Sequence, residues 1–137
     1  LNLICEDVVL VNTNSSSEIF EQLIRINEKD VIIAISFPRY SSKAVKAMHF
    51  AHSRGAKVIA ITDTPASPIA ELASYLLLAH SDMATVVDSL VAPLSLLNAL
   101  IVAVGMRRQK EVGETYAQLE KIWDEYDVYE KNEENIV

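Results

Sequence analysis

The sequence predicts a three-layer α/β domain with a mostly parallel sheet. Continuous β-branched runs, which are typical of strands covered on both faces, occur at 30–36 (DVIIAIS) and 56–62 (AKVIAIT). Segments with helical spacing alternate with these runs, and the connections are short. The chain of 137 residues holds only three glycines and four prolines, which argues against an all-β fold with many tight turns.

The outer strands and the first helix follow from local patterns. Residues 7–12 (DVVLVN) and 75–79 (YLLLA) each predict a short strand. Ser15 is followed three residues later by Glu18, a capping-box pattern that predicts the start of a helix.

Two further helices are expected after the central strands. Apolar residues recur at helical spacing from 44 to 51, and Gly55 is placed to end that helix because glycine readily adopts the left-handed conformation. Ser67 precedes Pro68, a pair that predicts a helix cap and a first turn. A short helix is therefore expected to begin at Ser67.

A long apolar helix is predicted from about residue 84 to 108, with Pro93 as a kink or a first-turn residue. Residues 89–106 carry no formal charge. This run is compatible with a membrane helix and with a buried or interface helix. Serine, proline and asparagine dilute it, which favours the second interpretation.

A second C-terminal helix, at 111–126, carries an apolar seam on an acidic surface. The seam residues recur at helical spacing: Val112, Tyr116, Leu119, Trp123 and Tyr126. We expect the domain to span residues 5–126 and residues 127–137 to form a flexible acidic tail.

The net charge of −7 belongs to the C-terminal segment. Residues 111–137 hold nine acidic and two basic side chains, whereas residues 1–110 hold ten of each. No basic face of the kind that binds a phosphate backbone is evident, so we expect no direct DNA binding by this chain. The single cysteine, Cys5, excludes a disulfide framework, and no signal-peptide pattern is present, which predicts a cytoplasmic protein without a membrane segment.

The loop at 36–42 follows a predicted strand and opens a helix. Ligands of parallel sheets bind beyond the carboxyl ends of the strands. Ser36, Ser41 and Ser42 offer hydroxyl groups there, and the helix N-terminus favours an anion. Arg39 could contact a phosphate or a carboxylate, and Tyr40 could stack on a sugar. A solvated arginine in a turn that merely caps the helix explains the same residues equally well.

The next two loops carry weaker candidates. Asp63 could accept hydrogen bonds from sugar hydroxyls or simply initiate a turn. Ser67 fits a structural cap better than a ligand contact. His80 and Asp82 could act as acid–base groups, although Ser81 or Asp82 more simply caps the long helix.

Metal and cofactor sites have little support. His49 and His52 lie three residues apart on a predicted helix, but no third ligand is evident. The chain has no nucleotide-binding glycine motif and no nucleophile motif. We therefore expect neither a metal nor a cofactor.

The segment at 30–79 closely resembles the sugar isomerase (SIS) domain: DVIIAISFPRYSSKAVKAMHFAHSRGAKVIAITDTPASPIAELASYLLLA. The ISFPRYS variant, followed by DSLVAPLSLLNALI, is similar to the C-terminal effector domain of RpiR/MurR-type transcriptional regulators. The resemblance covers nearly the whole chain. It implies a five-stranded parallel sheet, phosphosugar binding, and association as dimers or higher oligomers.

In many SIS domains a loop with the pattern S-x-S-G-x-T binds the phosphate of the ligand. Ser36 matches its first serine, and Ser41 stands at its threonine. Pro38 replaces the second serine and Arg39 the glycine. The residues expected at the phosphosugar are Ser36, Phe37, Arg39, Tyr40, Ser41, Thr62 and Asp63.

The family's first strand and the regulators' helix-turn-helix domain have no counterpart in this sequence. DNA contact is therefore expected only through a helix-turn-helix domain absent from this chain. The expected partners are a sugar phosphate effector and further copies of the chain, in a homodimer or tetramer formed through helices 84–108 and 111–126.

These features indicate a phosphosugar-sensing, oligomerising effector domain of a transcriptional regulator of carbohydrate metabolism. Two alternatives stay open. A sugar-phosphate isomerase needs an acid–base group, and the SIS enzymes place catalytic Glu and Lys near the start of the long helix, where this chain offers only Asp82 and Asp88. A ligand-free dimerisation domain would tolerate Ser36→Ala and Arg39→Ala with changes in stability alone.

Overall fold

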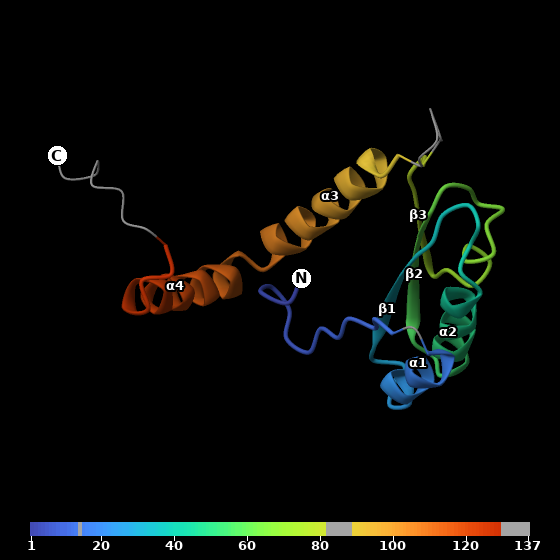
Figure 1. Ribbon diagram of the computed structural model, residues 1–137, viewed down its shortest axis with the longest axis horizontal. Helices are drawn as coiled ribbons and strands as arrows, with labels where there is room; N and C mark the ends of the chain where they lie inside the picture. Colours follow the sequence, from blue (N-terminus) through green and yellow to red (C-terminus); the bar gives the residue numbers. More distant parts are fainter. Residues whose placement is uncertain (14, 82–88, 130–137) are drawn as a thin grey trace. The chain divides into compact units, whose positions relative to one another are not determined.

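The computed structural model (Figure 1) describes residues 1–13, 15–81 and 89–129. The chain forms two compact units, each of which is described by itself. One unit comprises Leu10–Asn98, and the other comprises Leu1–Val9 together with Ala99–Val137.

The Leu10–Asn98 unit is built on a three-stranded parallel sheet. Its strands are β1 (Val31–Ile35), β2 (Lys57–Thr62) and β3 (Tyr75–Leu78), in the order β1-β2-β3. Three of the predicted strands are thus confirmed, and so is the α/β class. The described residues hold three strands, where the family resemblance implies five. Because all three strands run parallel, their carboxyl ends lie at one edge.

Two helices pack beside this sheet. Helix α1 (Ser16–Leu23) contacts α2 (Ser42–Ser53), and α2 contacts β1 and β2. Met48 of α2 and Val58 and Ala60 of β2 are fully buried in the main core. Gly55 ends α2 with φ +84°, as predicted. The core therefore fixes β2 most firmly, and with it the loop that follows Thr62.

The predicted strand at 7–12 was wrong. Residues 8–12 have no regular secondary structure, and Val9 and Leu10 are 71% and 81% exposed. The β-branched residues give the segment strand propensity, but a strand also needs a neighbour for its backbone groups. Among the described residues, β1 pairs only with β2, so no such neighbour is present for 7–12.

The short helix predicted at Ser67 is a series of turns instead. Its backbone bonds run from the Ala70 N–H to the Ser67 carbonyl and from the Ala73 N–H to the Ala70 carbonyl, both over three residues. The segment buries Ile69 completely and then enters β3. Burial of that side chain over such a short connection favours turns over a regular helix.

Two helices follow the sheet. Helix α3 (Val91–Arg107) begins in one unit and ends in the other, and α4 (Gln109–Glu125) lies in the second unit. Pro93 occupies the first turn of α3, where its missing N–H is harmless. In the parts of the chain that the structure covers, no single helix is long and apolar enough to cross a membrane; the pair α3–α4 reaches the required length and composition only across a 98° bend.

Candidate functional site

The loop between β1 and α2 is closed by one of its own serines. Ser36 is 7% exposed, and its N–H donates to the Ile61 carbonyl of β2. Its Oγ accepts the N–H of Ser41 at 3.1 Å. Ser36 therefore ties the end of β1 to the start of α2.

Ser41 is the N-cap of α2. It has an extended backbone (φ −71°, ψ 116°), and its Oγ accepts the Ala44 N–H at 3.4 Å. The first turn of α2 contains no acidic residue, so the partial positive charge of the helix N-terminus is not neutralised from within that turn. The 12-residue helix can therefore favour an anion at this end.

Arg39 adopts the left-handed conformation, with φ +68°. For a residue with a side chain, this conformation costs about 1–2 kcal/mol. Pro38 precedes it, and proline followed by a residue with positive φ is typical of a type II turn, in which the second position usually carries glycine. Arg39 stands where the pattern S-x-S-G-x-T has glycine, and its backbone adopts a conformation that suits glycine. Its side chain adds a guanidinium at this position.

Tyr40 and Asp63 join the loops that follow β1 and β2. The Tyr40 hydroxyl donates to Asp63 Oδ1 at 2.8 Å, and the Thr62 hydroxyl donates to the same oxygen at 3.1 Å. Thr62 is fully buried at the end of β2. Asp63 is thus hydrogen-bonded both to the last residue of β2 and to the loop that follows β1.

These bonds change the titration of both groups. Desolvation acts to raise the pKa of Asp63, but hydrogen bonds from Tyr40, the backbone and Thr62 outweigh it and lower this pKa below its ordinary value. The hydrogen bond to Asp63, aided by desolvation and by the carboxylate charge, raises the pKa of Tyr40. Both groups are therefore held in the forms that make the bond, a carboxylate and a neutral phenol.

The structure brings most of the predicted site residues into one hydrogen-bonded arrangement. Ser36 and Ser41 close the first loop, while Tyr40, Thr62 and Asp63 connect it to the second. Phe37 and Arg39 lie within the first loop, half-buried and exposed respectively. Sequence reasoning missed the bond between Tyr40 and Asp63. Its available signal was a hydroxyl and a carboxylate in loops that follow adjacent strands.

Two other serines near the carboxyl edge are buried. Ser67 and Ser81 are 3% and 5% exposed, and neither Oγ has a hydrogen-bond partner among the residues that the structure describes. Ser81 does not cap α3, because that helix begins at Val91. His80 is exposed. The remaining acid–base candidates, Asp82 and Asp88, lie outside the described residues.

His49 and His52 are exposed on α2. Within the ranges 1–13, 15–81 and 89–129, no group of three or more His, Cys, Asp or Glu side chains could hold a metal ion.

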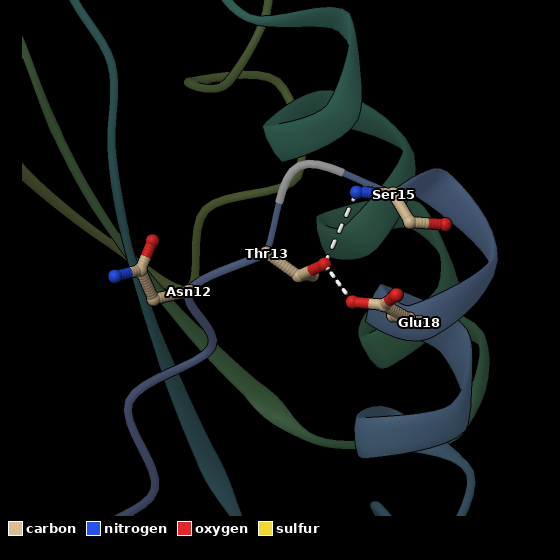
Figure 2. A pocket seen from close by; sticks show the side chains of 4 residues that line it. All are labelled: Asn12, Thr13, Ser15 and Glu18. Carbon is tan, nitrogen blue, oxygen red and sulfur yellow. Dashed lines mark hydrogen bonds between the residues drawn. The ribbon is translucent and has the colours of Figure 1, made fainter.

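A pocket at the start of α1 has the wrong charge for a phosphate. Figure 2 shows its lining residues, Asn12, Thr13, Ser15 and Glu18. The Thr13 hydroxyl donates to the Glu18 carboxylate and accepts the Ser15 N–H at 3.1 Å. The capping box predicted between Ser15 and Glu18 is therefore not formed, because Glu18 bonds to Thr13. The carboxylate would repel an anion here.

The family model of the SIS domain matches residues 7–103. The chain belongs to the SIS domain family. No protein with a curated function matches the chain significantly.

Solved structures share this fold. The sugar isomerase domain of an RpiR transcription factor from Sphaerobacter thermophilus superposes with a TM-score of 0.79 at 24% identity, over 88% of this chain and 66% of that one. The NanR protein of Vibrio vulnificus, complexed with ManNAc-6P, gives a TM-score of 0.73 at 16% identity, over 91% and 48%. A Bacillus subtilis protein assigned to the phosphosugar isomerases gives 0.55 at 24% identity, over 82% and 35%. This SIS chain thus spans about two thirds or less of the length of these proteins.

Proposed function

We propose that this SIS domain is the phosphosugar-sensing effector module of a transcriptional regulator of carbohydrate metabolism. The observation that carries the proposal is the loop 36–41, which places a helix N-terminus, two serine hydroxyls and an arginine at the carboxyl edge of the sheet. The similarity in fold to an RpiR factor and to NanR supports the same role.

The phosphate is assigned to Ser36, Arg39 and Ser41. The Ser36 hydroxyl uses one acceptor site for the Ser41 N–H, which leaves its own proton for an anion. Arg39 supplies charge, and its guanidinium suits a phosphate. The sugar would then extend over Phe37 and Tyr40 toward Thr62 and Asp63, at the end of the neighbouring strand.

Thermal-shift measurements test this function directly. Hexose 6-phosphates and N-acetylhexosamine 6-phosphates are compared with the same sugars without phosphate. A ligand at one hundred times its Kd stabilises the folded chain by about 2.7 kcal/mol, so a rise in melting temperature is expected for one class of sugar phosphate.

Two variants make that test specific. Ser41→Ala should abolish the ligand-induced rise, whereas Ser53→Ala, at the exposed C-terminal end of α2, should preserve it. If no sugar phosphate shifts the melting temperature, or if Ser41→Ala responds as the unsubstituted chain does, the sensing role is contradicted.

Association of subunits is the second part of the proposal. Helices α3 and α4 expose large apolar side chains: Val91, Leu94, Val102, Met106, Tyr116 and Ile122. Surfaces of this kind typically form protein interfaces. Binding of the phosphosugar would change the relation between subunits that carry DNA-binding domains outside residues 1–137. A clean monomer in sedimentation at high protein concentration would contradict this part.

An isomerase is the competing function, because a structural neighbour is assigned to that class. Aldose–ketose isomerisation needs a base whose pKa lies near the working pH. Asp63 is poorly suited, since its hydrogen bonds lower its pKa. Turnover of a sugar phosphate that disappears in Asp82→Asn would favour the enzyme over the sensor.

A further inference from the structure

Two hydrogen bonds fix the chain on either side of the strained residue in loop 36–41. Ser36 Oγ accepts the Ser41 N–H at 3.1 Å, and the Tyr40 hydroxyl donates to Asp63 Oδ1 at 2.8 Å. Between Ser36 and Tyr40 lies Arg39, with φ +68°. A residue with a side chain keeps this conformation only where its surroundings impose it.

The constraint on Arg39 can be followed back to the core. Thr62 is fully buried at the end of β2, and its hydroxyl donates to Asp63 Oδ1. Asp63 in turn holds Tyr40, the residue that directly follows Arg39. The loop that carries the arginine is therefore anchored to a strand that is not its own.

We propose that Tyr40 and Asp63 form a positioning pair, which keeps Arg39 in its left-handed conformation and so sets the position of its guanidinium at the anion site. The inference rests on the proposed phosphosugar function and refines it. Asp63 acts through Tyr40 and Arg39, and its main role is not to bind a sugar hydroxyl. Without the pair, the backbone at residue 39 relaxes toward negative φ and the arginine leaves its place.

Inorganic phosphate separates this role from direct sugar contact. If Asp63 only binds a sugar hydroxyl, Asp63→Asn weakens the binding of sugar phosphates but leaves inorganic phosphate unaffected. If the pair positions Arg39, both Asp63→Asn and Tyr40→Phe weaken inorganic phosphate as well.

The experiment measures the affinity for inorganic phosphate from amide chemical shifts in the full chain. Tyr40→Phe and Asp63→Asn should each weaken binding by about tenfold, since Tyr40→Phe removes the charge-assisted hydrogen bond and Asp63→Asn removes the charge of its acceptor. Tyr75→Phe, at an exposed tyrosine of β3, is the matched control and should bind as the unsubstituted chain does.

Arg39→Gly provides the second background. Glycine adopts positive φ without help, and it has no guanidinium to position. The affinity of Arg39→Gly for phosphate should therefore be low, and adding Tyr40→Phe should change it by less than about twofold. Equal losses from Tyr40→Phe in both backgrounds would show that the pair does not act through Arg39, and would overturn the inference.

The order of the loop and the binding of phosphate are measured separately. The amide exchange of Ser41, whose N–H is bonded to Ser36, needs no ligand and should speed up in Tyr40→Phe while amides of β2 stay protected. Phosphate binding that Tyr40→Phe leaves unchanged overturns the inference alone. Absence of binding of both inorganic phosphate and sugar phosphates by the unsubstituted chain overturns the proposed function, and the inference with it.

Discussion

The N-termini of α1 and α2 are similar in sequence and different in structure. Each begins with serines, Ser15 to Ser17 in α1 and Ser41 with Ser42 in α2, and the N-cap serine of each has an extended backbone. Ser41 caps its helix through its side chain. Ser15 makes no such cap, and its hydroxyl lies 2.7 Å from that of Ser17.

Charge separates the two ends further. The first turn of α1 contains Glu18, which is bonded to Thr13, whereas the first turn of α2 contains no acid and follows Arg39. The loop before α2 is also anchored to β2 through Asp63. We therefore propose an anion site at α2 and not at α1, although both helices begin with serine hydroxyls. The charge of the first turn and the anchoring of the loop distinguish the two.

The largest expected effect comes from giving the α2 loop the acidic character of α1. Arg39→Glu removes a charge-assisted contact and adds repulsion, so it should weaken sugar phosphate binding by roughly a hundredfold or more. Calorimetric titration with the sugar phosphate that gives the strongest thermal shift measures this. Glu18→Gln, which removes the acid at α1, is the control and should leave the affinity unchanged. An unaltered affinity of the Arg39→Glu variant would show that the Arg39 guanidinium does not contact the phosphate.

The second effect concerns stability. Ser41→Ala removes an N-cap hydrogen bond and should lower the free energy of unfolding by about 1 kcal/mol. Ser15→Ala should lower the free energy of unfolding by only a few tenths of a kcal/mol, because the Ser15 side chain makes no cap bond. Urea unfolding of the two variants gives the comparison. Equal losses at both positions would show that the caps do not differ in solution.

The core of the fold was predictable because its signals are local. The β-branched runs of β1 and β2 and the glycine after α2 each specify their own structure. Residues 7–12 have the same local character but are not a strand, since pairing depends on a neighbour that the described residues do not provide. Ser67 likewise has the local signals of a cap, but the burial of Ile69 decides its conformation.

The residue types of the candidate site could be read from the sequence, but the hydrogen bond that joins its two loops could not. The position of Ser36, Arg39 and Ser41 after a strand fitted an anion loop and a helix-capping turn equally well, and the family resemblance favoured the anion loop. The left-handed backbone of Arg39 could be inferred only by alignment with a family glycine, and it is observed here directly. The bond between Tyr40 and Asp63 joins residues 23 positions apart, and it depends on the two loops meeting at one edge of the sheet.

The smallest effect is the pH dependence of the anchored loop. The folded-state pKa of Asp63 is lowered, so its contribution to stability is present above about pH 4 and is lost as the pH falls through the folded value. The folded-state pKa of Tyr40 is raised, so its contribution is present below about pH 10 and is lost as the pH rises through the folded value.

The difference in melting temperature between the unsubstituted chain and Asp63→Asn should therefore be constant from about pH 5 to 9 and should shrink on both sides. Tyr40→Phe should show the same loss in acid, since it removes the other half of the pair. A difference that persists unchanged to pH 3 would mean that the carboxylate does not hold the loop, and the contrast between the two helix starts would then rest on charge alone.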